Sequence, residues 1–432
     1  MKKFTIKTLG CKTNQLESSI IEEKLVKNGF IYTNSIEEAD YFILNSCSVT
    51  SNTDDKALSL IKSVKNQKPE IKIVLTGCFV QLDGEELKNN KNINYLVGNA
   101  NKFDIPEIIN GENRYKIDDI FSEKNFHYEK LNFTKKTRAT IKIQDGCNNR
   151  CSYCTIPLAR GLNRSNKAEN IIEQINTFHE NGFKEIVLTG IHIGQWGKDF
   201  LPAKNIIDLL KMIESTDIHR YRLGSLDPLE LDDEVINFLS ESKKFCPHFH
   251  ISLQSFCNKT LKAMNRNYSE DYIFDRISTI HSKFSLPFIG SDIIVGFPDE
   301  TEEDFLITKN NLEKLELSQI HVFPYSKRKN TKAYSMENQV DEKIKKERVK
   351  IIQSISNKKH FEFLKKNIGT INEIIIEQNP DKKTKFLKGV TRNYINVLLT
   401  PDKIAPKNSV QKIKITAFFE DNRKLIAKVN NN

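Results

Sequence analysis

The chain has 432 residues, of which 28% are charged and 38% hydrophobic, and its net charge is +10. This length predicts about three domains, and the composition lies outside the range of disordered chains. No stretch approaches the roughly 20 apolar residues of a membrane span, and the basic start, Met1–Leu9, lacks the apolar core of a secretory signal. We therefore expect a globular, cytoplasmic protein without membrane contact, whose basic charge favours a polyanionic partner such as nucleic acid.

Three strand-like runs in the first part of the chain each end on a cysteine. They lead to Cys11, Cys47 and Cys78, and helical patterns over Glu17–Asn28 and Thr53–Asn66 separate them. This alternation predicts a parallel βαβαβ sheet, in which ligands gather at the carboxyl ends of the strands. The three cysteines are therefore expected to converge, which favours a metal cluster. Buried, inert thiols are the alternative.

A second triad, Cys147, Cys151 and Cys154, is packed into eight residues. In a cytosolic protein, such spacing is more typical of metal ligands than of disulfides. The pattern C-x3-C-x2-C offers three thiolates and no local fourth ligand, which favours an iron-sulfur cluster with one iron left open. Zinc with a fourth ligand from elsewhere in the chain is the alternative. Cys246 and Cys257 follow no such pattern, and we interpret them as structural thiols.

A polar, aromatic stretch over residues 118–136 has no clear periodicity, and we expect a linker there. Beyond it, strand-like runs recur six times, with helical patterns between most of them. The runs cover Thr140–Gln144, Glu185–Gly190, Arg220–Leu226, His248–Gln254, Phe288–Val295 and Gln319–Tyr325. Six repeats are too few for a closed eightfold barrel, so we expect a partial one. An amphipathic helix over Asp341–Asn357 then joins the domains.

The last part of the chain, residues 367–432, consists of short β-rich runs separated by turns. These runs are Ile371–Glu377, Tyr394–Thr400, Lys412–Thr416 and Lys424–Val429. They predict a small β-barrel, and its basic residues favour a surface for looped or single-stranded RNA. The basic residues are Lys382, Lys383, Lys385, Lys388 and Arg392. A barrel that merely packs on the other domains is the alternative.

The segment Asp145–Pro157, together with the order of the two triads, resembles the radical S-adenosylmethionine methylthiotransferase family. Leu9–Gln15, Asn45–Thr50 and Thr76–Phe79 resemble its amino-terminal domain, and the final segment is similar to its TRAM domain. The resemblance implies an α/β chain with a parallel amino-terminal sheet in residues 1–117. It further implies a partial (β/α)6 radical S-adenosylmethionine barrel in residues 137–366 and a TRAM-like, RNA-binding β-barrel in residues 367–432.

Two 4Fe-4S clusters and S-adenosylmethionine are the cofactors that this resemblance implies. The catalytic cluster, on Cys147, Cys151 and Cys154, would bind S-adenosylmethionine at its open iron and reduce it to methionine and a 5′-deoxyadenosyl radical. The auxiliary cluster would carry the sulfur to be inserted, after its methylation by a second S-adenosylmethionine. Its ligands would be Cys11, Cys47 and Cys78.

The ends of the predicted barrel strands are where we expect further cofactor contacts, because function in β/α barrels lies at this face. The resemblance implies S-adenosylmethionine contacts from Gly190, Ser225, Gln254 and Gly296, although both glycines also suit plain turns. We do not assign a catalytic role to His192 from the sequence.

Two arginines follow the second triad at a spacing of four. Arg160 and Arg164 share one face if this stretch is helical, where they would contact phosphate or the cofactor carboxylate. A solvated basic face is the alternative.

Within the family, Gly10–Gln15 most resembles the enzymes that add a methylthio group to C2 of N6-threonylcarbamoyladenosine beside the tRNA anticodon, at position 37. The expected partners are therefore the tRNA anticodon loop and an electron donor such as flavodoxin or ferredoxin. Relatives that act on isopentenyl-adenosine or on a ribosomal protein aspartate provide alternative substrates. A noncatalytic RNA-binding protein with structural metal is an alternative of another class.

Overall fold

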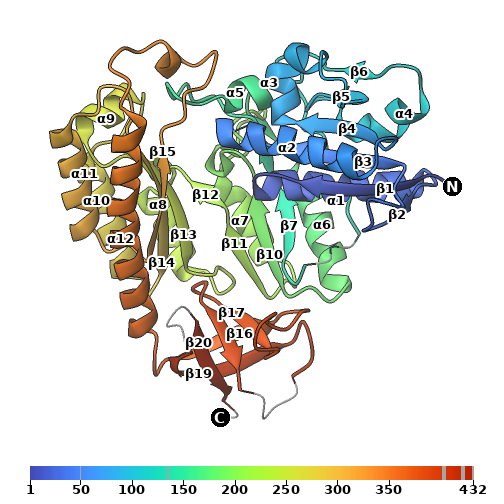
Figure 1. Ribbon diagram of the computed structural model, residues 1–432. Helices are drawn as coiled ribbons and strands as arrows, with labels where there is room; N and C mark the ends of the chain where they lie inside the picture. The colour runs from blue at the N-terminus through green and yellow to red at the C-terminus, as the bar shows by residue number, and fades with distance from the viewer. Residues whose placement is uncertain (49, 133, 135, 401–404, 420–423, 431–432) are drawn as a thin grey trace.

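The computed structural model describes residues 1–432 except 49, 133, 135, 401–404, 420–423 and 431–432. It comprises an amino-terminal sheet, a central partial barrel and a small carboxyl-terminal barrel (Figure 1). This mixture of parallel sheets, helices and one closed β-barrel confirms the predicted fold class. Across the described ranges, no helix has the length and apolar character needed to cross a membrane.

The amino-terminal sheet is parallel, with the strand order β2-β1-β3-β4-β5-β6. Its strands are β1 (Lys3–Thr8), β2 (Ile31–Tyr32), β3 (Tyr41–Ser46), β4 (Lys72–Gly77), β5 (Tyr95–Val97) and β6 (Tyr115–Lys116). Its helices are α1 (Lys12–Lys27), α2 (Ser51–Gln67), α3 (Cys78–Leu87) and α4 (Ile105–Asn110). All six residues of β3 are buried, as expected for a strand covered on both faces. The first helix starts earlier than predicted, because its polar first turn carries no apolar periodicity.

The central domain forms an open ring of parallel strands. In order around the ring they are β7 (Ala139–Lys142), β10 (Glu185–Thr189), β11 (Arg220–Leu223), β12 (Ser225–Leu226), β13 (His248–Gln254), β14 (Phe288–Val295) and β15 (Gln319–Pro324). The predicted third strand is divided at Gly224 into β11 and β12. β7 and β15 stand at the two ends of the ring and do not pair with each other, so the barrel is partial, as predicted.

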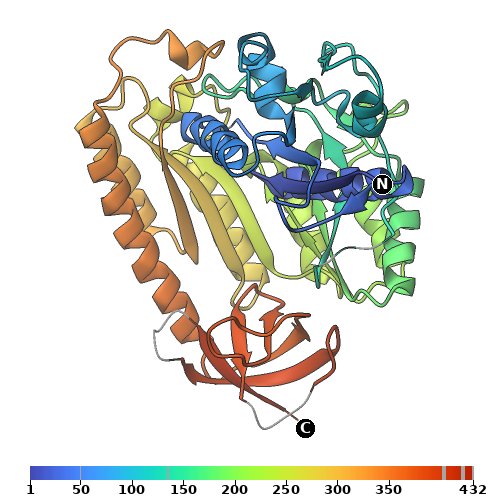
Figure 2. The same ribbon diagram turned by 45° about the vertical axis from the view of Figure 1, so that its right-hand side comes forward.

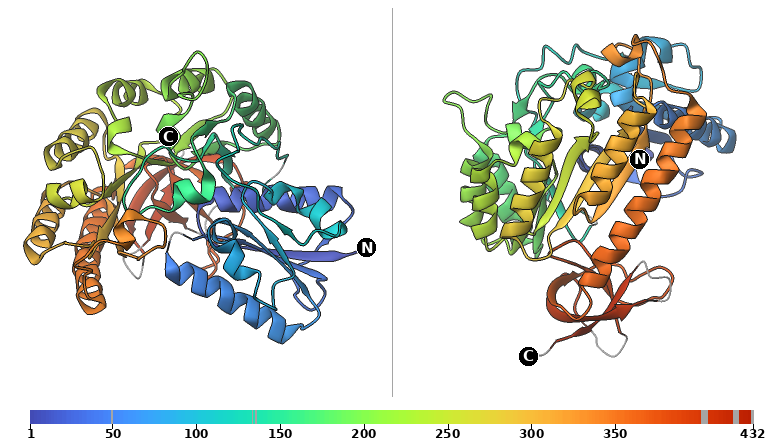
Figure 3. Two further views of the ribbon diagram at one scale, coloured as in Figure 1. Left: turned by 90° about the horizontal axis from the view of Figure 1, so that it is seen from above. Right: turned by 90° about the vertical axis from the view of Figure 1, so that its left-hand side faces the viewer.

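Helices cover the outside of this ring, and the amino-terminal domain closes its open side (Figure 3). The outer helices are α6 (Ala168–Glu180), α7 (Ile206–Glu214), α8 (Asp233–Glu241), α10 (Glu270–Lys283), α11 (Glu302–Lys314) and α12 (Glu342–Lys366). Short α5 (Ile156–Arg160) and α9 (Asn258–Ala263) and the antiparallel pair β8 (Gln144–Asp145) and β9 (Arg164–Ser165) complete the domain. Leu16 and Ile20 of α1 share one apolar core with Ile141 of β7, so the first two domains are packed as one body.

The stretch that we interpreted as a linker packs against both domains. The backbone N–H of Leu131 donates to Gln174 at 2.9 Å, and the Gln174 amide donates back to the Leu131 carbonyl at 2.7 Å. On the amino-terminal side, His127 stacks on Phe103 with ring centroids 5.0 Å apart. The connection therefore packs across the boundary between the two domains and contacts both of them.

The carboxyl-terminal barrel is closed in the order β16-β17-β18-β20-β19. Its strands are β16 (Ile371–Ile376), β17 (Lys388–Thr391), β18 (Asn396–Leu399), β19 (Val410–Phe418) and β20 (Leu425–Val429). Four strands match predicted runs, whereas β17 was missed. Its sequence, Lys-Gly-Val-Thr, is short and contains a glycine, so it lacks a clear strand pattern.

This barrel lies beneath the central strands (Figure 2). Two buried arginines of β11 attach it there. Arg220 and Arg222 each donate to Glu185, at 2.6 and 2.7 Å. Their remaining donors reach backbone oxygens of the small barrel, including that of Val390 from Arg220 at 2.9 Å and that of Thr391 from Arg222 at 2.6 Å. Burial raises the pKa of Glu185, but the arginines outweigh it and lower the pKa to about 2. The carboxylate therefore holds both cations in place.

We predict that Arg220→Met loosens the carboxyl-terminal barrel. The substitution removes a fully buried guanidinium and should lower the free energy of unfolding by about 3–5 kcal/mol, because Glu185 loses a buried partner. Hydrogen exchange should rise in β17. Arg276→Met, which removes a pair with exposed Asp233, is the control and should cost about 0–1 kcal/mol. Equal losses from the two variants would contradict this account.

Candidate functional site

The three amino-terminal cysteines lie at one edge of the sheet. β1, β3 and β4 are adjacent and in register. Cys11 follows the end of β1 after two residues, Cys47 follows β3, and Cys78 begins α3 at the end of β4. Since neighbouring strands lie about 4.8 Å apart, the fold brings the triad together at this edge. Cys47 and Cys78 are buried, and Cys11 is exposed.

Two glycines allow this close approach. Gly10 and Gly77 have φ angles of 104° and 103°, in a region that side-chain-bearing residues rarely adopt. A Cβ on Gly10 would lie 2.4 Å from the Cβ of Cys47, and one on Gly77 would lie 2.2 Å from the carbonyl oxygen of Ser46. A side chain at either position would push the neighbouring strand end away, so the glycines set the spacing of the triad.

The second triad occupies the loop between β8 and α5, and none of its cysteines forms a disulfide. The backbone N–H of Asn149 donates to the sulfur of Cys147, and that of Ile156 to the sulfur of Cys154, each at 3.4 Å. Such donors favour the thiolate form that binds metal. Burial raises the pKa of Cys154 to about 12, so its thiolate needs a nearby cation at neutral pH.

Two side chains that the sequence analysis did not assign contact this triad. Arg266 donates from Nη1 to the sulfur of Cys151 at 3.4 Å. His192 places Nδ1 at 3.6 Å from the sulfur of Cys147 and Nε2 at 2.7 Å from Glu230. Burial lowers the pKa of His192, but the contacts with Cys147 and Glu230 outweigh it and raise the pKa to about 10. No sequence spacing connects Arg266 with a cysteine 115 residues before it.

The donor chemistry of both triads fits a sulfur-ligated metal cofactor. Each offers three free thiols at the carboxyl ends of strands, and the central set is surrounded by N–H and cationic groups. Among the described residues, no three His, Cys, Asp or Glu side chains already stand as a set that would hold a metal ion. Support for a metal cofactor therefore comes from the chemistry of the cysteine thiols and their neighbours, and not from ligands already arranged around a metal position.

Three of the four residues expected to contact S-adenosylmethionine lie at the carboxyl ends of central strands, and the fourth, Ser225, lies just beyond the end of β11. Gly190 follows β10, Ser225 begins the short β12, Gln254 ends β13 and Gly296 follows β14. The second cysteine triad lies in the loop that follows β7 and β8. The fold therefore puts these residues on the face that carries the cysteine loop, where β/α barrels place their active sites.

Packing by itself also requires both of these glycines. A Cβ on Gly190 would lie 2.8 Å from the carbonyl oxygen of Gln144. Gly296 has a φ of 71°, and a Cβ there would lie 2.3 Å from Cγ of Lys345 on α12. The turn role is thus present for Gly296, whereas close packing is what requires Gly190, and the cofactor contact of each stays a prediction.

Arg160 and Arg164 do not share a helical face. The helix α5 ends at Arg160, Gly161 follows with a φ of 74°, and Arg164 lies on β9. Both side chains are buried, so the alternative of a solvated basic face is also wrong. Arg160 binds protein carboxylates instead, with Nη1 at 2.9 Å from Glu17 and 3.0 Å from Asp145. The four-residue spacing gave a wrong prediction because the helix ends at Arg160, so the two arginines are not on the same helix.

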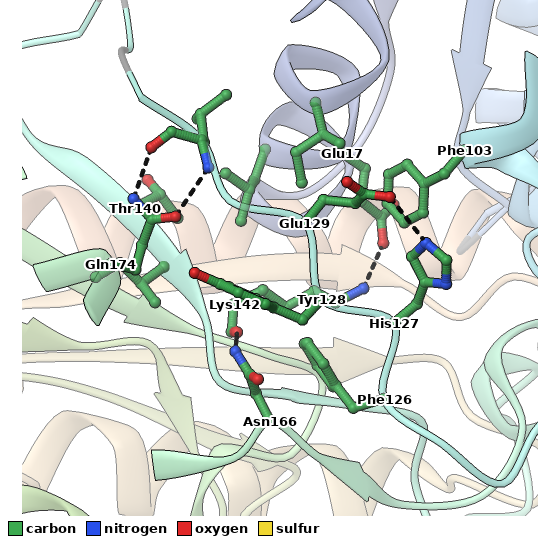
Figure 4. A pocket seen from close by; sticks show the side chains of 14 residues that line it. Glu17, Phe103, Phe126, His127, Tyr128, Glu129, Thr140, Lys142, Asn166 and Gln174 are labelled. Carbon is green, nitrogen blue, oxygen red and sulfur yellow. Dashed lines mark hydrogen bonds and ion pairs between the residues drawn. The ribbon is translucent and has the colours of Figure 1, made fainter. Parts of the chain in front are cut away.

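Glu17 is the centre of a buried charge cluster between the two cysteine-bearing domains. Its Oε1 lies 2.9 Å from both Lys142 Nζ and Arg160 Nη1, and its Oε2 lies 2.6 Å from Lys102 Nζ. Figure 4 shows Lys142 directed from β7 toward Glu17 on α1. Burial raises the pKa of Glu17, but Arg160, Lys102 and Lys142 outweigh it and hold the pKa well below its usual value. This carboxylate therefore joins cations from both domains.

Two asparagines connect α5 with the amino-terminal cysteines. Asn14 accepts from Arg160 Nη2 at 2.6 Å, and its Oδ1 lies 3.9 Å from the sulfur of Cys11. Asn99 donates to a backbone oxygen of α5 at 2.6 Å and to the sulfur of Cys78 at 3.6 Å. Because α5 follows the second triad directly, these contacts hold the two triads at a set separation.

The remaining two cysteines lie within the core. Cys246 and Cys257 are buried, and the sulfur of Cys257 donates to Asp304 at 3.6 Å. Burial raises the pKa of Cys246. These surroundings agree with the interpretation of both as structural thiols.

The five basic residues of the carboxyl-terminal barrel that the sequence analysis named fall into two groups. Lys388 pairs with Glu377 at 3.3 Å, and Arg392 donates to two backbone oxygens of the central domain at 2.7 Å. The other three, Lys382, Lys383 and Lys385, are exposed in the loop before β17. That loop is a basic surface which remains open to a polyanion.

Comparison with known proteins agrees with this architecture. Residues 3–98 match the model of uncharacterized protein family UPF0004, and residues 141–311 match that of the radical SAM superfamily. The threonylcarbamoyladenosine tRNA methylthiotransferases of Aquifex aeolicus and Bacillus subtilis are 34% and 37% identical to the chain. The alignments cover 91% and 94% of this chain and 96% and 92% of those proteins. The chain belongs to the radical S-adenosylmethionine tRNA methylthiotransferase family.

A second kind of relative in this family differs in the named substrate. The tRNA-2-methylthio-N(6)-dimethylallyladenosine synthase of Clostridium botulinum is 33% identical to the present chain. The alignment covers 96% of the present chain and 95% of the relative. Among solved structures, the radical S-adenosylmethionine methyltransferase TsrM of Kitasatospora setae has a TM-score of 0.58 at 12% identity, with 77% of each chain covered, which supports the fold. Membership of the family implies one 4Fe-4S cluster, S-adenosylmethionine and a tRNA substrate.

We predict that Glu17→Gln destabilises the methylthiotransferase by about 3–5 kcal/mol, because three buried cations lose their shared carboxylate. A carboxyl with a depressed pKa contributes stability above its unfolded pKa, and this contribution is lost as the pH falls through the folded value. The difference in the free energy of unfolding between the variant and the parent should therefore be nearly the same at about pH 7 and at about pH 5.

Urea denaturation of both proteins at the two pH values measures this difference. Glu23→Gln on the same helix is the control, because Glu23 pairs with the exposed Lys27 and should contribute about 0–1 kcal/mol. If Glu17→Gln costs no more than Glu23→Gln, the buried cluster does not stabilise the domain boundary.

Proposed function

We propose that this protein is a tRNA (N6-threonylcarbamoyladenosine-C2) methylthiotransferase, which forms 2-methylthio-N6-threonylcarbamoyladenosine at position 37. The observation that carries the proposal is the pair of three-cysteine sites held together across one domain boundary by α5 and Glu17. A reaction that both activates a carbon and delivers sulfur needs two such sites. The relatives from Aquifex aeolicus and Bacillus subtilis carry the name of this activity.

In this proposal each triad holds a 4Fe-4S cluster. Cys147, Cys151 and Cys154 hold the cluster that binds S-adenosylmethionine, and Cys11, Cys47 and Cys78 hold the auxiliary one. Bound there, the cofactors supply the one-electron chemistry that activates a carbon–hydrogen bond and the methylated sulfur that replaces the hydrogen. The protein orients the groups and excludes water, and Gly190, Ser225, Gln254 and Gly296 line the face for S-adenosylmethionine.

The tRNA and the source of electrons complete the proposal. The anticodon loop reaches the cysteine sites, and the exposed loop with Lys382, Lys383 and Lys385 contacts the phosphate backbone. An electron donor such as flavodoxin or ferredoxin reduces the catalytic cluster. There are two alternative substrates. One is isopentenyl-adenosine in tRNA, which is the dimethylallyladenosine in the name of the Clostridium botulinum relative. The other is an aspartate of a ribosomal protein.

Nucleoside mass spectrometry after anaerobic turnover tests the reaction and the substrate together. We expect a methylthio mass gain on threonylcarbamoyladenosine when the cluster-loaded protein receives S-adenosylmethionine, a reductant and tRNA that lacks the sulfur. The same incubation with tRNA that carries isopentenyl-adenosine is the matched control and should give no gain. A gain on isopentenyl-adenosine alone would replace the proposed substrate. Binding of tRNA without cleavage of S-adenosylmethionine would indicate the noncatalytic alternative.

Cysteine variants separate the two proposed clusters. Replacing Cys11, Cys47 and Cys78 by alanine should halve the bound iron and abolish methylthio transfer, while 5′-deoxyadenosine still forms. Replacing the other triad by alanine should also halve the iron but abolish 5′-deoxyadenosine. Iron analysis and chromatography of the nucleosides measure both quantities. The double replacement of Cys246 and Cys257 is the control and should leave the iron unchanged; full iron in the first variant would refute the auxiliary cluster.

A further inference from the structure

A cavity of about 390 Å³ lies where the three domains meet. Lys12 and Gln15 of α1 form one wall, and the segment before β7 with Lys136 and Arg138 forms another. The inner surface of the central barrel contributes Arg222, and the carboxyl-terminal barrel closes the far side. The centre of a β/α barrel is usually filled by branched apolar side chains. Here it leaves a space that is lined by polar and cationic groups.

The charge around this cavity is unbalanced. Its described lining includes six Lys and Arg side chains and one carboxylate, that of Glu377. Arg222 already donates its hydrogen bonds to Glu185 and to backbone oxygens, and Arg138 pairs with Glu377 at 3.1 Å. Glu377 also pairs with a second cation of the lining at 3.3 Å. The cavity therefore keeps an excess of positive charge, which suits an anionic ligand group.

Lys382 and Lys12 are the cations of the described lining that remain free for such a group, and Lys12 is the one on the amino-terminal domain. It makes no hydrogen bond or ion pair with any described residue, and its side chain is exposed although it lies between domains. Lys136, by contrast, donates to the side chain of Gln15. Lys12 also follows Cys11 directly in the chain. The ammonium group that would hold a ligand atom thus belongs to the residue next to one cysteine of the amino-terminal triad.

The two candidate nucleosides differ in the chemistry that this cavity recognises. The threonylcarbamoyl group carries a carboxylate and a hydroxyl, whereas the dimethylallyl group has only carbon and hydrogen. An apolar substituent would displace water from Lys12 without replacing its hydrogen bonds, and such a loss disfavours the wrong substrate. In adenine, C2 and the N6-bearing carbon flank the same ring nitrogen, N1. When the N6 substituent is turned toward N1, its carboxylate lies on the same side of the base as C2, the carbon that receives the methylthio group.

We propose that this cavity binds the carboxylate of the N6-threonylcarbamoyl group and that Lys12 is the residue which anchors it. The inference rests on the proposed function and deepens it, because it names the residue that selects the substrate. The stretch Gly10–Gln15, whose resemblance favoured this substrate, supplies two of the lining side chains, Lys12 and Gln15. The physical reason for the selection is the charge-assisted hydrogen bond from the ammonium group to the carboxylate.

Binding of matched RNAs tests the role of Lys12 without turnover. The probes are two anticodon stem-loops, one with threonylcarbamoyladenosine and one in which the threonine carboxylate is replaced by an uncharged carboxamide. Fluorescence anisotropy with the cluster-loaded protein, under anaerobic conditions at one fixed salt concentration, gives the ratio of the two affinities. We expect the parent protein to prefer the carboxylate RNA by about 10-fold to 100-fold, the range for one hydrogen bond to a charged group.

Three variants identify the source of this preference. Lys12→Met should bind both RNAs with nearly equal affinity, close to that of the parent for the carboxamide, and Lys12→Arg should keep most of the preference. Lys62→Met on α2 removes an exposed lysine outside the cavity, so it should preserve the ratio even if it weakens both affinities. Iron content and circular dichroism confirm that each variant is folded and loaded. Lys12→Gln replaces Lys12→Met if the latter fails this check.

The outcomes separate this inference from the proposed function. A full preference retained by Lys12→Met, in a parent that methylthiolates threonylcarbamoyladenosine, would overturn the role of Lys12 alone. A parent that shows no preference for the carboxylate and methylthiolates only isopentenyl-adenosine would overturn the proposed function and this inference together. Loss of the preference in Lys12→Met, with rescue by Lys12→Arg, supports the anchoring role. In turnover, the same variant should raise KM for threonylcarbamoyladenosine RNA more than it lowers kcat.

Discussion

Glu17 holds the two cysteine-bearing domains in register through charges that have no access to water. Removing a carboxylate and three cations from water is costly, and the cost is recovered only when the groups lie at hydrogen-bonding distance. Lys102 comes from the amino-terminal domain, whereas Lys142 and Arg160 come from the central one. A small shift between the domains would therefore leave charges buried without partners. The position of one triad relative to the other follows from this constraint.

The sites themselves arise from a shared property of parallel sheets, whose strands all end at one edge. In the amino-terminal sheet, Gly10 and Gly77 let neighbouring strand ends approach, and the cysteines that follow are brought together. In the central ring, the same rule gathers the cysteine loop and the residues after β10, β13 and β14. The amino-terminal domain covers the open side of the ring, so the two edges lie next to each other. This arrangement suits a reaction that joins an activated carbon to a delivered sulfur.

The small carboxyl-terminal barrel is fixed to the catalytic domains by a second set of buried charges. Arg220 and Arg222 share Glu185 and also satisfy backbone oxygens of the barrel. Its exposed basic loop is thereby held at a set distance from the cysteines. The barrel also closes the cavity at Lys12, so it forms part of the proposed substrate site as well as carrying the basic loop proposed to contact RNA.

Local patterns in the sequence were sufficient for the fold class and for the longer parallel strands, although not for the short β2, β5, β6 and β9, because periodicity and spacing record which residues face a core. They were insufficient for β17, which is too short to show a period, and for Arg160, whose partner Glu17 lies 143 residues earlier. The contact of Arg266 with Cys151 depends on how the central domain folds, and the cavity at Lys12 depends on how the three domains dock. The sequence by itself thus determined the family resemblance and the residues that we propose for the chemistry. Tertiary structure decided their partners, because buried charges are paired across domain boundaries rather than along the chain.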